Sequence, residues 1–174
     1  MILKIILVIA VLVAAILIFA VAKPNTFHLQ RSVIVQAPPD KIFPLINDLR
    51  NWKRWEPQDA DPTMKRTFSG PDYGVGAASD WSGEGRTGAG RMTISESKPL
   101  RSVTIDVDWR RPFTVRNVNQ FTLEPDGTGT RVAWSMYGPN VYLMKVMSVF
   151  TDMDRMMGKH FEEGQQNLKT VAEK

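Results

Sequence analysis

Residues 103–109 read VTIDVDW, and this stretch decides the fold. Apolar and polar side chains alternate strictly along it, which is the period of a β-strand with one buried face and one solvated face. The apolar members are Val103, Ile105, Val107 and Trp109. A strand of this kind needs neighbouring strands to pair with and another element to cover its apolar face.

The same two-residue period continues on both sides of this stretch. It predicts about six antiparallel strands in a row, and an additional strand stands earlier in the chain at residues 27–35. The consecutive strands are predicted at residues 64–69, 76–83, 90–98, 103–109, 114–123 and 132–136. Residues 124–129, EPDGTG, are typical of a hairpin turn. The sequence therefore predicts one antiparallel sheet.

Helical spacing replaces the strand period in two places. Residues 41–47 and 48–55 predict two short helices, and a long helix begins near Val141 with an expected break near Thr151. The apolar stripe of the long helix is Leu143, Met147, Phe150, Met157, Phe161 and Leu168. Because this helix is the only large element left to cover the sheet, we predict an α+β fold, in which a curved antiparallel sheet grips a long C-terminal helix.

An apolar run precedes the domain. Residues 5–22 contain no polar side chain, and at helical rise they extend about 27 Å, close to the thickness of a hydrocarbon core. An uncleaved single-pass anchor is the favoured interpretation. The alternatives are a cleaved secretory signal, for which residues 20–22 (AVA) offer a cleavage site, and a buried core helix. We expect an anchor at residues 1–22, a linker at 23–26 and one domain at 27–174, preceded by one transmembrane helix.

The charges on either side of the apolar run do not decide the membrane side of the domain. Lys4 and the α-amine precede the run, whereas Lys23, Arg31 and Lys41 follow it, so the positive-inside rule does not separate the two orientations. A very short N-terminal tail is easily left in the cytoplasm. We therefore expect a single-pass membrane protein with an extracytoplasmic domain.

Composition excludes several classes of function. All 18 acidic residues and all but one of the 22 basic residues follow the apolar run, and their signs are interspersed, so a nucleic-acid surface is not expected. The chain has no cysteine, which excludes disulfides and thiolate chemistry. Asp59 and Asp61 offer too few oxygen ligands for a metal site. No metal, cofactor or catalytic residue is predicted, and the oligomeric state stays open.

The order of the elements and several short motifs resemble the START-like helix-grip superfamily (SRPBCC), in its polyketide cyclase/dehydrase and lipid-transport branch. The opening strand-to-helix segment is IVQAPPDKIF at residues 34–43, followed by NWKRWEP at 51–57. Later hairpin segments are FSGP at 68–71, GVG at 74–76, FTLEPDG at 121–127 and GTRVAW at 129–134. The resemblance covers residues 26–172, and the apolar run lies outside it.

This resemblance implies a cavity between the inner face of the sheet and the long helix. Its expected lining is apolar and rich in aromatic side chains and methionine: Trp81, Trp109, Phe121, Trp134, Met136, Met147, Phe150, Met157 and Phe161. Such a cavity is typical of a small-molecule site. The expected function is binding of a hydrophobic small molecule or lipid by a domain that residues 5–22 attach to a membrane.

Two other functions remain open from the sequence. A polyketide cyclase/dehydrase-like enzyme acting on an aromatic substrate would need polar groups that converge inside the cavity, and the candidates are Glu96, His160, Asp154, Arg116 and Tyr137. A structural or interaction module would instead have a filled core and a large exposed apolar patch. Where these side chains lie in the folded chain separates the three hypotheses.

Overall fold

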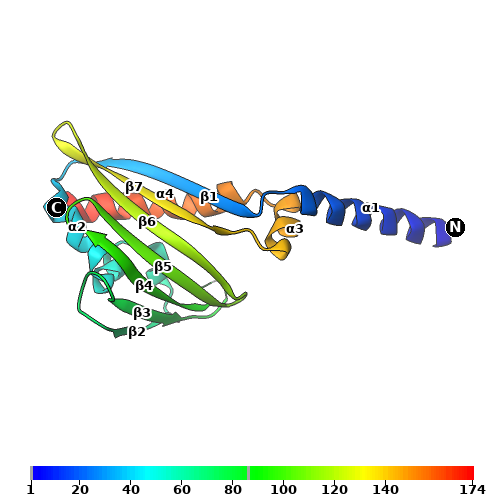
Figure 1. Cartoon of the computed structure of the whole chain (residues 1–174), viewed down its shortest axis with the longest axis horizontal. Helices are drawn as coiled ribbons and strands as arrows, with labels where there is room; N and C mark the ends of the chain where they lie inside the picture. The colour runs from blue at the N-terminus through cyan, green and yellow to red at the C-terminus, as the bar shows by residue number, and fades with distance from the viewer. Residues whose placement is uncertain (1, 86) are drawn as a thin grey trace.

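The computed structural model describes residues 2–85 and 87–174, in which a seven-stranded antiparallel sheet curves around helices (Figure 1). The strands are β1 (Thr26–Val35), β2 (Lys65–Ser69), β3 (Ala78–Ser82), β4 (Ala89–Lys98), β5 (Ser102–Arg111), β6 (Val115–Asp126) and β7 (Gly129–Pro139). They lie in the order β1-β7-β6-β5-β4-β3-β2. The first strand therefore pairs with the last, and consecutive hairpins build the rest.

The helices are α1 (Ile2–Ala22), α2 (Pro39–Asn47), α3 (Tyr142–Phe150) and α4 (Met153–Ala172), with short 3₁₀ turns η1 (Leu49–Arg54) and η2 (Pro57–Ala60). In Figure 1, α4 runs along the inner side of the sheet near β1 and β7. The predicted α+β class, a curved antiparallel sheet gripping a C-terminal helix, is confirmed.

The expected break in the C-terminal helix is present at residues 151–152. Thr151 ends α3 in an extended conformation, and the Asp152 carboxylate caps α4 by accepting a hydrogen bond from the Arg155 backbone N–H at 3.0 Å. Such a cap satisfies a donor at the start of a helix and so favours a new beginning there. As a result α4 packs against the sheet, whereas α3 lies against α1.

An aromatic cluster fastens α4 to the sheet and to the turn after α2. The rings of Trp134 and Phe161 stack with centroids 4.1 Å apart, and Phe121 also stacks with Trp134, with centroids 4.9 Å apart. Trp52 and Trp55 meet this cluster edge-on. All five side chains are almost fully buried, so the middle of the sheet is filled with protein.

The outer face of the sheet is polar, as the alternation in residues 103–109 predicts. Asp108 projects there and accepts a hydrogen bond from Arg116 Nε at 2.6 Å on the neighbouring strand. The Arg116 guanidinium lowers the pKa of the Asp108 carboxyl below its usual range, chiefly through this hydrogen bond. These charges pair across strands in solvent rather than in a cavity.

The lack of a side chain at Gly90 allows the ring of Trp81 to approach the backbone closely, beside the ring of Trp109. Trp81 packs over Gly90 and meets the ring of Trp109 edge-on, with centroids 5.0 Å apart. The Trp81 indole donates to the Thr87 carbonyl at 3.1 Å, which fixes its orientation. A Cβ on Gly90 would overlap the Trp81 ring and come within 2.6 Å of the Asp108 carbonyl oxygen. The packing of Trp81 against Trp109 therefore restricts the position of the Trp109 ring.

We expect Gly90→Ala to destabilise the domain by about 1–3 kcal/mol, because backbone and a packed ring must both shift to admit the methyl group. The urea midpoint measured by tryptophan fluorescence checks this. Gly127→Asn is the matched control, since Gly127 faces open space and Asn tolerates its positive φ. Equal midpoints for Gly90→Ala and the wild type would contradict the tight packing.

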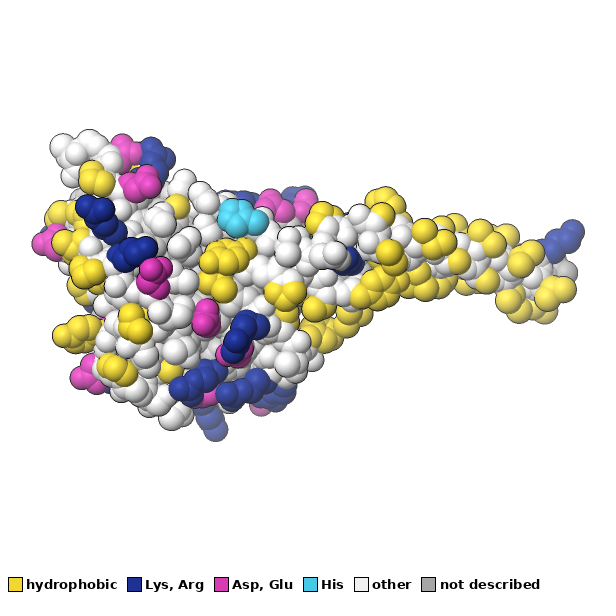
Figure 2. Space-filling model, in the orientation of Figure 1, with side chains coloured by type: hydrophobic (Ala, Val, Ile, Leu, Met, Phe, Trp, Pro, Cys, Tyr) yellow, Lys and Arg dark blue, Asp and Glu magenta, His cyan; other side chains and the backbone are white. Residues whose placement is uncertain are grey.

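The helix α1 extends away from the domain rather than into it. It is long and apolar enough to cross a membrane, and only 6% of its apolar window is buried. Figure 2 shows hydrophobic side chains along most of the visible face of this helix. This exposure does not fit the core-helix alternative. The core of the domain lies entirely between Leu29 and Ala172, so a fragment of residues 23–174 retains all of it.

Candidate ligand-binding pocket

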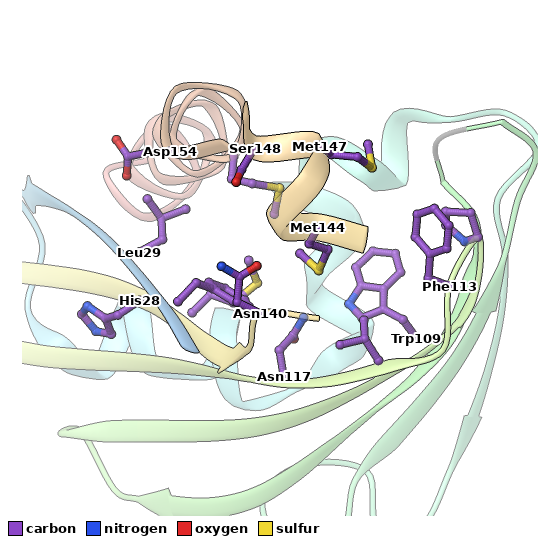
Figure 3. Close-up of a pocket in the computed structure, with 15 residues that line it drawn as sticks. His28, Leu29, Trp109, Phe113, Asn117, Asn140, Met144, Met147, Ser148 and Asp154 are labelled. Atoms are coloured by element: carbon purple, nitrogen blue, oxygen red, sulfur yellow. The ribbon is translucent and has the colours of Figure 1, made fainter. Parts of the chain in front are cut away.

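A pocket with a volume of about 370 Å³ lies between the inner face of the sheet and α3. Its size is within the range of small-molecule sites in proteins. Sheet residues form the floor, and Met144 and Met147 of α3 lie above them (Figure 3). Met157, near the start of α4, also contributes. The pocket exists because the chain breaks after α3, which leaves α3 spanning the end of the sheet beyond the reach of α4.

The lining is mainly apolar and comes from elements far apart in the chain. Strand β1 supplies Phe27, His28 and Leu29, the sheet interior supplies Trp109, Val115, Asn117 and Met136, and the segment before β6 supplies Pro112 and Phe113. The polar members on the helical side are Asn140, Ser148 and Asp154. The Asp154 carboxylate is 67% exposed and pairs with Arg31 at 2.9 Å, so its charge lies in solvent.

Eight of the nine residues that the sequence nominates for a cavity fall into two groups. Those lining this pocket are Trp109, Met136, Met147 and Met157, and of these Met136 also belongs to the buried core. Those in the packed core are Trp81, Phe121, Trp134 and Phe161. Phe150 belongs to neither group, because it lies on α3 with 70% of its surface exposed. The sheet's inner face thus serves as core in its middle and as pocket floor at the end nearest α3.

Sequence reasoning missed several lining residues. Phe27 and Leu29 follow the same two-residue alternation as other inward positions, so their pattern was a usable signal. Asn117 lies at an inward position of β6, two residues before Asn119 and four before Phe121. The same two-residue alternation therefore identifies it as an inward-facing polar residue. Phe113 lies in a short connection between strands, where periodicity gives no signal.

The polar residues nominated for an enzyme do not converge. Of the five, only Asp154 lines the pocket. Glu96 pairs with Lys98 at 3.0 Å, and Arg116 pairs with Asp108 on the outer face. Tyr137 packs its ring near His28 at 6.3 Å. Acid–base catalysis needs groups within hydrogen-bond reach of one substrate, and these residues do not provide such an arrangement in the described part of the chain.

His160 lies on α4 beside the packed core, and it is paired with a buried carboxylate. Its Nε2 lies 2.9 Å from Glu56 Oε1, and Glu56 is almost fully buried. Burial is the largest influence on the His160 pKa and lowers it, but the hydrogen bond and charge of Glu56, helped by Glu163, outweigh burial and raise this pKa above its ordinary value of 6.5. The pair links α4 to the turn preceding η2 and is structural in position.

We expect this pair to make the stability of the domain depend on pH. Because the pKa of His160 is higher in the folded state, the stabilising contribution is complete below about pH 6.5, the unfolded value, and is lost as the pH rises through the raised pKa. The thermal midpoint should therefore fall more steeply above pH 6.5 in the wild type than in His160→Gln. Parallel midpoint profiles for the two proteins would contradict the assignment.

Metal ligation has no support in the described residues. Across residues 2–85 and 87–174 no group of three or more His, Asp or Glu side chains is arranged to hold a metal ion. The lining of the pocket consists of apolar side chains and a few hydrogen-bonding groups.

Several solved structures share this fold. Protein CV1439 from Chromobacterium violaceum is 14% identical, with 87% of this chain and 99% of that chain covered and a TM-score of 0.60. Ginseng major latex-like protein 151 from Panax ginseng is 13% identical, with coverages of 84% and 97% and a TM-score of 0.62. The Aha1 dimer from Colwellia psychrerythraea is 17% identical, with coverages of 84% and 96% and a TM-score of 0.58. At these identities the likeness shows the fold alone.

No curated protein sequence matches the chain. The family described as polyketide cyclase / dehydrase and lipid transport does match, over residues 26–173, which is the whole domain from β1 to the end of α4. The predicted resemblance to the START-like superfamily is thereby confirmed, and α1 lies outside the matched region. With its curved sheet, its gripped helix and this match along the domain, the chain belongs to the polyketide cyclase / dehydrase and lipid transport family.

Proposed function

We propose that this protein is a membrane-anchored domain that binds a hydrophobic small molecule or lipid in the pocket beneath α3. The observation that carries the proposal is the pocket itself, about 370 Å³ lined mainly by apolar side chains. Transfer of apolar surface from water into such a site is favourable, at about 25 cal/mol per Å². Methionines in the lining adapt to irregular apolar shapes.

The helix α1 supports the membrane part of the proposal. Its side chains from Ile5 to Ala22 are apolar on every side, and they face outward rather than into the domain. In water this exposed surface would be costly, whereas in a bilayer a helix satisfies its own backbone hydrogen bonds. Anchoring is therefore the interpretation that accounts for the exposed surface.

The roof of the pocket is tied directly to the end of α1. The Tyr142 hydroxyl on α3 donates to the Leu17 carbonyl at 3.1 Å, and Lys23 Nζ donates to the Ser148 carbonyl at 2.8 Å. The buried Lys145 donates to the Asn25 side-chain oxygen at 2.6 Å. Three hydrogen bonds thus hold α3 against the anchor and its linker. A pocket roofed by α3 would then lie beside the bilayer surface.

The outward surface of α3 agrees with such a position. Its exposed side chains that do not line the pocket are large and apolar: Tyr142, Leu143 and Phe150. Beside α1 these side chains would meet the headgroup and upper acyl region, where amphipathic helices bind. A tethered pocket at this depth suits presenting, sensing or buffering a membrane-derived ligand better than carrying it over long distances. Cleavage after Ala22 would instead release a diffusible carrier.

Titration of fragment 23–174 with the apolar fluorophore N-phenyl-1-naphthylamine tests the proposed binding. The fragment is used because it has no α1 to collect the probe, yet it retains the core and the hydrogen bonds of Lys23 and Lys145 that hold α3 to the linker. We expect a saturable rise in fluorescence that corresponds to one site, together with quenching of tryptophan emission from Trp109. A linear, non-saturable response, or none at all, would overturn the proposal.

A further inference from the structure

Asn117 is a polar side chain on the floor of an otherwise mainly apolar pocket. It lies on β6, is 6% exposed, and lines the pocket below the methionines of α3 (Figure 3). Its Oδ1 is fully buried and has no hydrogen-bond partner among the described residues. A buried acceptor without a hydrogen-bond partner destabilises the fold, so a buried group of this kind requires an explanation.

The neighbouring inward-facing asparagine on β6 has a structural role, which provides a comparison. Asn119, two residues further along β6, accepts a hydrogen bond from the Trp134 indole at 3.1 Å and so completes the core. Asn117 Oδ1 accepts no hydrogen bond of this kind from the described residues. Since a half turn about its Cβ–Cγ bond exchanges the oxygen and the nitrogen, the Asn117 carboxamide can offer either an acceptor or a donor to a molecule in the pocket.

The charged residues around the pocket restrict the charge that a bound molecule can have. No Lys or Arg side chain is among the described residues that line it, and the lining residue His28 is exposed, with its ring near Tyr137. The one lining carboxylate, Asp154, is solvent-exposed and already paired with Arg31. A carboxylate or phosphate at the floor would therefore be buried without a counter-ion, which is strongly unfavourable. A neutral hydroxyl needs no counter-ion, and it both donates to and accepts from a carboxamide.

From this arrangement we infer that the pocket selects an uncharged, mainly apolar molecule with a single hydroxyl group, which Asn117 binds at the floor. The inference rests on the proposed function and names its ligand class. The hydrocarbon part occupies the space between β1, Trp109 and α3, and the hydroxyl satisfies the buried amide. Fatty alcohols and hydroxylated polycyclic lipids have this chemistry, whereas fatty acids and phospholipid headgroups do not.

Photolabelling of the full chain in lipid nanodiscs tests the inference. Three twelve-carbon probes with a diazirine at one chain end differ only at the other end, which is a hydroxyl, a methyl or a carboxylate. After irradiation, mass spectrometry gives the yield of adducts on tryptic peptide 132–145, which contains Met136 and Met144. Trypsin does not cut the Lys23–Pro24 bond, so adducts on residues 5–22 are located by fragmentation within tryptic peptide 5–31, and their yield corrects for the amount of each probe in the lipid.

We expect the alcohol to label peptide 132–145 at least about fivefold more than the alkane or the acid. Asn117→Leu should abolish that preference while alkane labelling persists, and Asn117→Ala should do the same without added bulk. Gln120→Leu, which removes a carboxamide from a non-core position of the same strand, should leave the preference intact.

The outcomes separate this inference from the proposed function. Equal labelling by the three probes in the wild type, or an alcohol preference that survives both Asn117 variants, would overturn the role of Asn117 while leaving an apolar pocket. If no probe labels peptide 132–145 above the level seen in Val115→Trp, whose new indole fills the pocket, the proposed function fails and this inference fails with it.

Discussion

Val115→Trp should weaken binding of N-phenyl-1-naphthylamine to fragment 23–174 by at least about tenfold, equivalent to about 1.4 kcal/mol. Val115 is at the start of β6 with its side chain in the pocket lining. It pairs with Trp109 on β5, so a new indole would stand beside an existing one and occupy the space the probe requires. The loss arises from excluded volume and needs no change in the fold.

The control for this variant is Val118→Trp. Val118 is on the same strand but outside both the pocket lining and the buried core, so the same bulk is added without filling the pocket. Circular dichroism should show that both variants fold. Binding by Val115→Trp equal to that of Val118→Trp would mean that the probe binds somewhere else on the domain.

Arginines at Leu12 and Val13 should release the full chain from membranes. Each arginine at the centre of a spanning helix costs about 2.5–3.5 kcal/mol, so the pair removes roughly 5–7 kcal/mol of insertion free energy. Both positions are near the middle of α1 and are exposed, so the domain itself should be unaffected. Alkaline carbonate extraction measures the effect as the share of protein left in the membrane pellet.

The matched control is Leu12→Ile with Val13→Leu, which keeps the hydropathy of α1 and should stay in the pellet. Mass spectrometry of the mature wild-type N-terminus distinguishes an anchor from a cleaved signal. Peptides that begin before residue 20 support the anchor. A mature chain that begins at Lys23, or retention of the double-arginine variant in the pellet, would contradict anchoring by α1.

Much of the fold follows from local patterns in the sequence. The alternation in residues 103–109 places β5 and its inward face, and the stripe containing Phe161 and Leu168 identifies the helix that the sheet grips. The break at Thr151 also has a local cause, because Asp152 caps the next helix. The turn η2 was not predicted, since residues 57–60 carry no periodic pattern. Strand β6 extends past Leu123 to Asp126 because its pairing with β7 continues to Gly129.

The pocket was predictable only in part, for a physical reason. Alternation predicts which side chains of a strand point inward. It does not predict whether other side chains fill the space in front of them. Met136 and Trp134 are both inward residues of β7, yet Met136 lines the pocket and Trp134 stacks on Phe161 in the core. The difference arises from where α4 ends and α3 begins, which is a tertiary property.

Analysis of the apolar extract of the purified full chain tests the proposed binding in its native setting. Wild-type protein and Val115→Trp are isolated from the same membranes in the same detergent, and their bound small molecules are compared by mass spectrometry. We predict one uncharged hydroxylated lipid, close to equimolar with the wild type and strongly depleted in Val115→Trp. Identical extracts from the two proteins, containing only bulk membrane lipid, would contradict a ligand-binding pocket beneath α3.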